Sequence, residues 1–402
     1  MEKKGTPNDE NLELETVNRD GYRLPNACRD KDHYFFTAIR GIQAEREYYV
    51  IMCPLWLLPV IFPLPEPNPP DERAQRLFTK SRVPKIKKYI INNPESYTVS
   101  SLTVSIDGDT DFIPFSNQEE IIAKAGHLKV PVKAGFSIND GQHRVTGLIL
   151  AYKEKNELRN ETVPIVFYTD GGLKRSQQMF SDLNRHAIRP TRSLSILYDH
   201  RDELARFTVK LSYSIPIFKN KTEFEKTNVS SKSPYLFTLS AVYQANRKLL
   251  DKTKGFNDED KRIAIDFWCE VTKNIIEYQQ LLSNDVTCQE LRDNYVHAHG
   301  VILVALGIIG HELINKYPDW KARLEKLGGI EWSRKNARSW EGRVISNDKI
   351  CKGRKNIQLA VNLLKTELGI PLAEKELLIE EEYRSKHQIL SKFFNNDIGP
   401  SH

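Results

Sequence analysis

The sequence changes its pattern near residue 190, and this change constrains the fold more than any other feature. Before it, β-rich runs alternate with helical ones: HYFFTAIRGIQAEREYYVIMCPL (33–55) predicts a hairpin, and ETVPIVFYTD (161–170) predicts a buried strand. After it, segments such as SPYLFTLSAVYQANRKLL (233–250) and VHAHGVILVALGIIGHELI (296–314) repeat apolar residues with the helical period. The fold class is therefore α+β, with a mixed α/β domain followed by a mainly helical domain.

Three parts are expected along the chain. Residues 1–30 are polar and predict a flexible tail, residues 31–195 an α/β domain, and residues 196–402 a mainly helical domain. A length of 402 residues fits two domains, because domains usually hold about 100–200 residues. Hydrophobic residues make up 40% and charged residues 28%, an ordinary globular balance that argues against wholesale disorder.

Cysteine usage and hydropathy indicate a cytoplasmic protein. The five cysteines are an odd number and form no CxxC pair, so neither a disulfide framework nor a zinc site is expected. His297 and His299 do not have the spacing of a helical zinc pair, and no metal site is predicted. The most apolar stretch, residues 48–65, contains four prolines and is too short for a membrane span of roughly 20 apolar residues. We expect it to form a buried strand followed by a proline-rich connection.

The charge balance permits a nucleic-acid partner without requiring one. The formal net charge is +6 and the isoelectric point is near 8.8. The sequence has neither a GxxxxGK[ST] phosphate loop nor a GxSxG nucleophile turn, and no DNA-recognition helix is legible in it. A DNA-binding interpretation therefore depends on where the basic residues cluster.

The stretch SINDGQHRVTGLILA, residues 137–151, lies where a strand is expected to turn into a helix. Gly141 allows a tight turn that brings the backbone close to a ligand. Free N–H groups at a helix start attract phosphate, and the Arg144 guanidinium adds a bidentate donor. We therefore expect Gly141, Gln142 and Arg144 to bind a phosphate or a nucleotide.

The acid and the imidazole of this motif leave two interpretations open. Asp140 would repel a phosphate unless it holds Arg144, binds a metal or acts on a water. Asp140, His143 and Arg144 are accordingly candidate catalytic residues, the first two as acid/base groups and the third as a phosphate clamp. The alternative is an aspartate that caps the helix, with His143 and Arg144 on a solvated first turn.

A second polar cluster occupies MFSDLNRHAIRPTRS, residues 179–193. Its polar residues are Asp182, Asn184, Arg185, His186, Arg189 and Arg192. Three arginines so close together suit phosphate contacts. Asn184 and Arg185 are thus candidate phosphate-binding residues, and Arg189 and Arg192 are candidate DNA contacts. The alternative is a helix end whose basic residues interact with the helix dipole.

Two further segments are rich in basic residues. The first contains Lys80, Arg82, Lys85, Lys87 and Lys88. We expect Lys80, Arg82, Lys85 and Lys88 to contact a DNA backbone, and an ordinary solvated surface is the alternative. The second, residues 330–356, mixes Trp332 and Trp340 with eight basic residues. This mixture predicts binding to nucleic acid or a protein partner, unless the tryptophans fix a loop onto the helical domain.

Three blocks of the sequence resemble one known family. INDGQHRVTGL is similar to the signature of the DGQHR-domain proteins. MFSDLNRHAIRPTRSLSILYDHRD and the region from IEWSRKNARSWEGR to GIPL resemble later blocks of the DndB family of bacterial DNA sulfur-modification proteins. The similarity runs in the same order from about residue 33 to about residue 375. The DGQHR region is also similar to the ParB-like superfamily, which implies a ParB-like fold for the α/β domain.

The resemblance implies a function in DNA phosphorothioation, the replacement of a non-bridging phosphate oxygen by sulfur. DndB-type proteins act as negative transcriptional regulators that bind DNA upstream of the modification operon. The expected partners are promoter DNA and the sulfur-modification enzymes, for which the chain is alternatively a scaffold. No membrane partner is expected, and a homo-oligomer stays open.

The ParB-like superfamily implies an enzymatic alternative. In that superfamily a related box binds a nucleoside triphosphate, and some members hydrolyse the nucleotide or cut DNA. The second candidate function is therefore a nucleotide hydrolase (ATPase) or DNA-nicking enzyme that uses a nucleoside triphosphate with Mg²⁺. One position departs from the pattern, because His143 stands where the ParB-like box usually carries an arginine.

Overall fold

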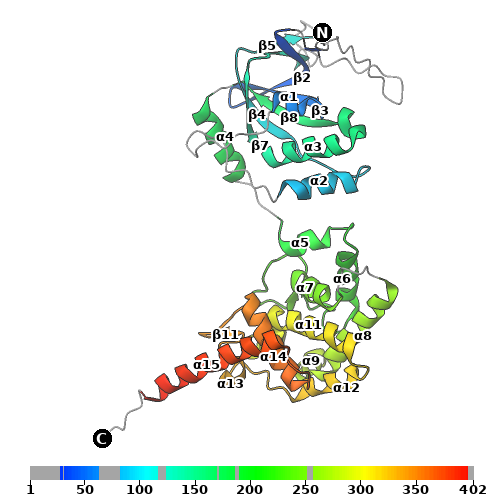
Figure 1. Cartoon of the computed structure of the whole chain (residues 1–402), viewed down its shortest axis with the longest axis vertical. Coiled ribbons are helices and arrows are strands. Elements are labelled where there is room, and N and C mark those ends of the chain that lie inside the picture. The colour runs from blue at the N-terminus through cyan, green and yellow to red at the C-terminus, as the bar shows by residue number, and fades with distance from the viewer. Residues whose placement is uncertain are drawn as a thin grey trace, which may run out of the picture. The chain divides into compact units, whose positions relative to one another are not determined.

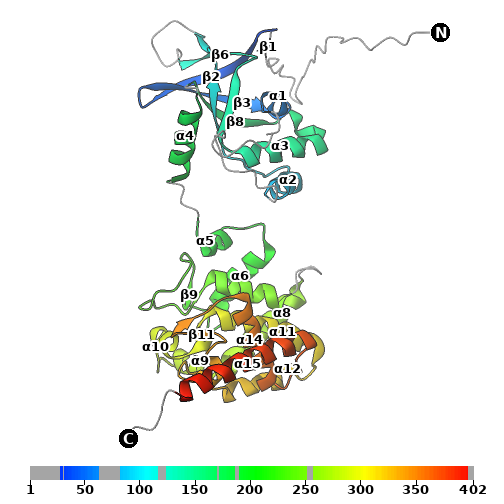
Figure 2. The same cartoon turned by 60° about the vertical axis from the view of Figure 1, so that its left-hand side comes forward.

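The structure is a computed structural model of the 402-residue chain. It describes residues 28–29, 31–62, 82–115, 124–169, 172–185, 190–250 and 257–396. The pattern of contacts divides the chain into two compact units, residues 1–188 and 189–402. The first unit is built around a sheet and the second from helices (Figures 1 and 2).

The described part of the first unit contains a mixed sheet of eight strands. Its strands are β1 (Cys28–Arg29), β2 (His33–Gln43), β3 (Arg46–Pro54), β4 (Leu102–Asp107), β5 (Asp111–Pro114), β6 (Ala125–Pro131), β7 (Gly135–Asp140) and β8 (Thr162–Tyr168). The order across the sheet is β5-β6-β2-β3-β8-β4-β7, and β1 pairs with β2. The pair β4 and β8 is parallel, and the other pairs are antiparallel.

Helices of the first unit connect and cover these strands. They are α1 (Leu58–Ile61), α2 (Val83–Asn92), α3 (Gln142–Glu154) and α4 (Leu173–Arg185), with a 3-10 helix at Asn156–Asn160. α2 begins with Pro84 in its first turn, where a missing backbone N–H costs no hydrogen bond. α2 and α3 pack closely, because a Cβ atom on Gly147 would lie only 2.5 Å from the Ile86 side chain.

The two faces of the sheet have different surroundings. One face packs Ile51 and Val104 against Val145 and Leu148 of α3 in a buried core. The opposite face carries α4 beside β7, and farther along the sheet its apolar side chains are open to solvent, as with Met52, which is 65% exposed. β7 therefore lies between two helical layers before it leads into α3 (Figure 1).

Several predicted elements of this unit are confirmed, and two need correction. The hairpin at 33–55 is β2–β3, turned by Ala44 and Glu45 in left-handed conformations, and the strand at 161–170 is β8. The connection after β3 is not wholly irregular, because residues 58–61 form α1 with a proline in its first turn. On α4, the helical spacing of Met179 and Leu183 predicts that both lie on one apolar side. Met179 is buried, but Leu183 is 43% exposed, so the buried side of that helix is narrower than this spacing predicts.

The second unit is mainly helical. Its helices are α5 (Arg192–Leu197), α6 (Glu203–Ser214), α7 (Leu239–Leu249), α8 (Asp258–Asn274), α9 (Ile276–Leu282), α10 (Cys288–Asn294), α11 (Gly300–Lys316), α12 (Trp320–Leu324), α13 (Ala337–Trp340), α14 (Arg354–Glu367) and α15 (Glu374–Asn396), with 3-10 helices at Val296–Ala298 and Glu325–Gly329. Two short strand pairs join them: β9 (Thr222–Glu223) with β10 (Phe237–Thr238), and β11 (Ile345–Ser346) with β12 (Lys349–Ile350).

α11 is the central helix of this unit. Its sequence is apolar almost all round, which is typical of a helix enclosed by others, and it packs against both α7 and α14. Gly307 permits the close approach of α7, because a Cβ atom there would lie 2.3 Å from the Ala245 carbonyl oxygen. The core around α11 includes the fully buried indoles of Trp268, Trp332 and Trp340.

The predicted α+β class, a mixed α/β part followed by a mainly helical part, is confirmed. Among the described residues, no helix combines the length and the apolar character that crossing a membrane requires.

Candidate phosphate-binding site

The motif Asp140–Arg144 forms a strand, a one-residue turn and a helix start, as predicted. β7 ends at Asp140, Gly141 has φ +108°, and α3 begins at Gln142. This φ lies in a region that side chains with a Cβ atom rarely adopt, and a Cβ atom on Gly141 would also lie 2.5 Å from the Leu102 side chain. The turn therefore requires glycine for both conformation and space.

Asp140 holds Arg144 across this turn. The Arg144 Nη2 atom lies 2.5 Å from the Asp140 Oδ2 atom, and Arg144 Nη1 donates to the Ser100 carbonyl oxygen at 3.3 Å and to the Ser100 hydroxyl. The Asp140 and Arg144 side chains are 47% and 22% exposed, so the pair is reachable from solvent. The capping interpretation of Asp140 is wrong, because Gly141 occupies the capping position.

His143 stands in the first turn of α3, half-buried and close to a second cation. Burial is the main cause that lowers the pKa of His143, and the nearby charge of Arg82 lowers it further. Arg82 immediately precedes α2, so the starts of α2 and α3 meet at the same corner of the unit. The backbone N–H groups of a helix start favour an anion, and here two starts converge near two arginines.

The remaining residues of the motif and of the basic run frame this corner. Gln142 is half-buried, and its carbonyl oxygen accepts a hydrogen bond from Thr146 at 3.1 Å. Lys85 and Lys88 lie three residues apart on α2, and both side chains are exposed. Lys87 is not part of that free surface, since it pairs with Glu154 of α3. Lys80 lies outside the described residues.

The second predicted cluster is only partly within the described residues. α4 ends at Arg185, and the Arg185 side chain is exposed. The Asn184 side chain, together with His186 and Arg189, lies outside the described part of the chain. Arg192 begins α5 and belongs to the helical unit. None of the described contacts joins Arg185 to Arg144, so phosphate binding by Arg185 stays a prediction.

Asn139 is a site residue that sequence reasoning missed. It is fully buried beside Asp140, and its side-chain amide donates to Ser105 Oγ at 2.7 Å and lies 2.9 Å from Met179 Sδ. These contacts attach the end of β7 to α4 and so fix the backbone that presents the motif. A polar residue at an inward strand position was the available signal, but the adjacent charged residues obscured it.

The tryptophans of segment 330–356 are interior rather than exposed. Trp332 and Trp340 are 1% and 0% exposed, their rings stack with centroids 5.6 Å apart, and each indole N–H donates to a backbone carbonyl oxygen. The prediction that these rings bind nucleic acid or a protein partner is wrong, because both rings are packed inside the helical core. Two basic residues of the same segment, Arg334 and Lys352, instead line a cavity.

A sequence profile of the family described as DndB, DNA-sulfur modification-associated, matches residues 36–371. The chain belongs to the DndB family. The matched range includes the Asp140–Arg144 motif and extends through most of the helical unit, so the match covers parts of both units. No curated protein and no solved structure matches the chain, and the ParB-like fold of the first unit therefore stays a prediction.

The cofactor expected from the resemblance, a nucleoside triphosphate with Mg²⁺, makes specific demands on this DndB-family chain. The described residues contain no group of three or more histidine, cysteine or acidic side chains that could hold a metal ion. Mg²⁺ often binds through one or two carboxylates plus the phosphates of its nucleotide. Asp140 could serve as such a carboxylate only after it leaves Arg144.

Proposed function

We propose that this DndB-family chain is a DNA-binding negative regulator of the operon for DNA phosphorothioate modification. The observation that supports it most is the corner where the starts of α2 and α3 meet beside Arg82, His143 and Arg144 in a chain of this family. Such a corner attracts phosphate oxygens whatever the base sequence. Contacts of this kind to the DNA backbone position a protein on a duplex.

The ion pair in the motif sets how a phosphate binds there. Arg144 is bound to Asp140, so an incoming phosphate competes with a carboxylate for the same guanidinium. The pair is partly exposed and therefore contributes little stability of its own, about 0–1 kcal/mol. A phosphate can also accept hydrogen bonds from the backbone N–H groups at the two helix starts. It is therefore a stronger partner for the guanidinium than the Asp140 carboxylate is.

Exposed lysines of α2 extend this surface. Lys85 and Lys88 lie on the helix that Arg82 precedes, and neither forms an ion pair within the described residues. Lysines in this position add affinity for any DNA backbone, and each neutralised phosphate makes the affinity more dependent on salt.

The salt dependence of DNA binding tests this proposal. Affinity for a duplex from upstream of the modification operon is measured by fluorescence anisotropy between about 50 and 200 mM salt. We expect the log–log slope of the double variant Lys85→Ala/Lys88→Ala to be shallower by about 0.9 for each phosphate that the variant no longer neutralises. Arg144→Ala should weaken binding to this duplex as well.

Lys133→Ala is the matched control. Lys133 is an exposed lysine in the turn before β7, at the opposite end of that strand from Asp140, so its removal should leave the slope unchanged. A wild-type protein that binds no such duplex at low salt would refute the proposal. Equal slopes for all three variants and the wild type would show that Lys85 and Lys88 of α2 do not contact the DNA backbone.

Nucleotide hydrolysis or DNA nicking is the second candidate function. His143 favours it, because its lowered pKa keeps the imidazole neutral and able to accept a proton at neutral pH. Asp140 argues against it, since a carboxylate bound to Arg144 is not free to act as a base. A scaffold role likewise stays a proposal, and it would use exposed basic residues such as Lys335 and Arg338 rather than the buried tryptophans.

A further inference from the structure

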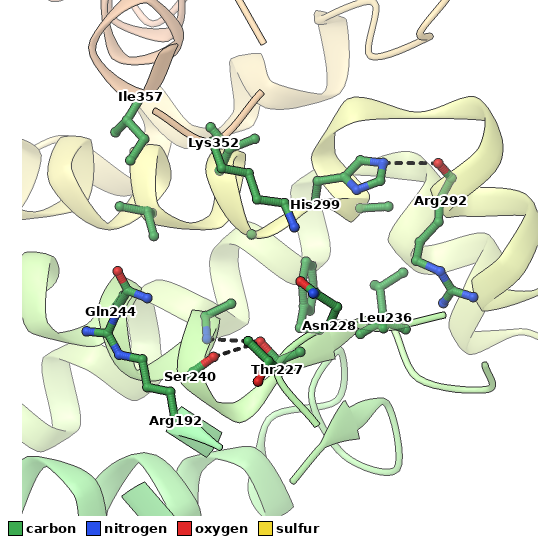
Figure 3. Close-up of a pocket in the computed structure, with 18 of the residues that line it drawn as sticks. Arg192, Thr227, Asn228, Leu236, Ser240, Gln244, Arg292, His299, Lys352 and Ile357 are labelled. Carbon is green, nitrogen blue, oxygen red and sulfur yellow. Dashed lines mark hydrogen bonds between the residues drawn. The ribbon is translucent and has the colours of Figure 1, made fainter. Parts of the chain in front are cut away.

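A cavity of about 470 Å³ opens in the helical unit, whereas the DGQHR motif belongs to the sheet unit. Its walls come from the start of α5, the loop before β10, the start of α7, the α10–α11 connection and segment 330–356 (Figure 3). Pockets that bind small molecules commonly have volumes of about 300–1,000 Å³, so this cavity is large enough for a ligand of nucleotide size.

Basic side chains dominate the charged lining of the cavity. Four cations, Arg192, Arg292, Arg334 and Lys352, face one carboxylate, that of Asp293. Arg192 and Lys352 are exposed, form no ion pair within the described residues, and approach the cavity from opposite sides (Figure 3). A cavity with this charge excess favours an anion over a neutral or cationic ligand.

Neither of the two inner arginines forms an ion pair within the described residues. Arg292 is 6% exposed, and its guanidinium donates to carbonyl oxygens of the loop residues Ser230, Ser231, Ser233 and Tyr235. Arg334 donates to the carbonyl oxygens of Arg292, Asp293 and Asp348. Carbonyl groups satisfy the hydrogen-bond donors but carry no formal charge, so both cations still contribute a positive potential to the cavity.

The start of α11 adds a neutral donor site beside these cations. His299 precedes the 17-residue helix and provides no side-chain cap for its first N–H groups. The His299 ring Nε2 lies 3.0 Å from the Arg292 carbonyl oxygen. Burial is the main cause that lowers the pKa of His299 to about 4, and the charges of Arg334 and Lys352 lower it further. The ring is therefore neutral at neutral pH and adds no positive charge to the cavity.

Part of the cavity lining is apolar and open to a ligand. Val229, Ala241 and Ile357 are partly exposed side chains that line it, and hydroxyl and amide groups of Ser240, Gln244 and Asn228 line it as well. An inorganic anion would use only the cations and would leave this apolar surface uncovered. A ligand with a flat ring and a phosphate uses both, because the ring covers apolar surface while the phosphate meets the cations.

We propose that the helical unit binds a mononucleotide-sized ligand, a planar heterocycle that carries phosphate, in the cavity between Arg192 and Lys352. The phosphate lies near Lys352, Arg334 and the first N–H groups of α11, and the ring lies against the partly exposed side chains of Val229, Ala241 and Ile357. This site is separate from the DGQHR motif, and its ligand does not depend on DNA binding by that motif.

Calorimetric titration of the full chain with the four ribonucleoside monophosphates tests the proposal. Ribose 5-phosphate is the probe without a ring base, and adenosine is the probe without a phosphate. We expect at least one monophosphate to bind and both partial probes to bind at least tenfold more weakly. Lys352→Ala should weaken binding of the monophosphate by roughly tenfold, the effect expected for the loss of one charge-assisted hydrogen bond.

Two control variants locate the binding. Lys335→Ala removes an exposed positive charge of the same segment that does not line the cavity, and it should bind like the wild type. Arg144→Ala, which disables the DGQHR corner, should also bind like the wild type. The proposal is overturned if no monophosphate binds, or if ribose 5-phosphate binds as tightly as the best monophosphate. It is equally overturned if Arg144→Ala abolishes binding while Lys352→Ala leaves it unchanged, a result that would place the nucleotide at the DGQHR corner instead.

Discussion

At the scale of single residues, the DGQHR motif depends on the one residue that has no side chain. Gly141 turns the chain from β7 into α3 with a positive φ, and it does so against Leu102. Asp140 and Arg144 are placed on either side of this turn and meet only because the turn is tight. The chemistry of the corner thus rests on a backbone conformation.

Three glycine-to-alanine substitutions separate the contributions to this turn. Gly141→Ala adds both backbone strain and a clash, Gly172→Ala adds strain at φ +109° with nothing within 4 Å, and Gly135→Ala adds neither. We expect Gly172→Ala to lower the free energy of unfolding by about 1–2 kcal/mol and Gly141→Ala to lower it further, with little change for Gly135→Ala. Urea denaturation followed by far-UV circular dichroism measures the order. Equal decreases for Gly141→Ala and Gly172→Ala would mean that Leu102 moves away without cost.

At the scale of elements, the sequence predicted those whose periodicity packing enforces. The β2–β3 hairpin, β8 and the helical second half follow from alternation or from the helical repeat, because each buries the apolar side that its pattern displays. α1 was missed, since a four-residue helix is shorter than any period can reveal. The meeting of Arg82 with His143 was unpredictable too, because it depends on how α2 packs against α3 and not on either sequence.

The placement of the C-terminal helix depends on a buried ion pair. Arg343 donates to both carboxylate oxygens of Glu380 on α15, at 2.8 and 2.5 Å, and both side chains are 6% exposed. The Arg343 guanidinium also lies 4.1 Å from the centre of the Tyr383 ring. Because this pair is enclosed, removal of one partner leaves the other charge buried and unpaired.

Substitution of Arg343 should therefore destabilise the helical unit strongly. We expect Arg343→Met to lower the free energy of unfolding by about 3–5 kcal/mol. Arg384→Met is the matched control, since Arg384 pairs with the same carboxylate but is 65% exposed, and it should cost less than about 1 kcal/mol. Urea denaturation followed by tryptophan fluorescence compares them, because Trp268, Trp320, Trp332 and Trp340 all belong to the helical unit. Similar decreases for the two variants would contradict the assignment.

At the scale of the whole molecule, two separate cores account for the two units. One core lies within the sheet unit, around Ile51, Val104 and Leu148, and another within the helical unit, around Trp268 and Trp332. Each core encloses residues of a single unit only. A unit with its own core has the means to fold alone.

Separate expression of residues 28–188 and 189–402 tests this independence. We expect both fragments to be soluble, with cooperative thermal unfolding by circular dichroism, and the helical fragment to show the larger helical signal. Size-exclusion chromatography should find each fragment compact. A fragment that unfolds without a cooperative transition, while the intact chain keeps one, would show that its core needs the other unit.

The ion pair between Asp140 and Arg144 couples the binding of an anion by the guanidinium to the release of the carboxylate. An oxyanion that captures the guanidinium leaves the carboxylate without its counter-charge. Ligand arrival would then create, in the same step, an acidic group able to recruit a cation or a proton. The five-residue motif would thus exchange one ion pair for another. The oxyanion of the ligand would pair with the Arg144 guanidinium, and the Asp140 carboxylate would become available to a cation or a proton.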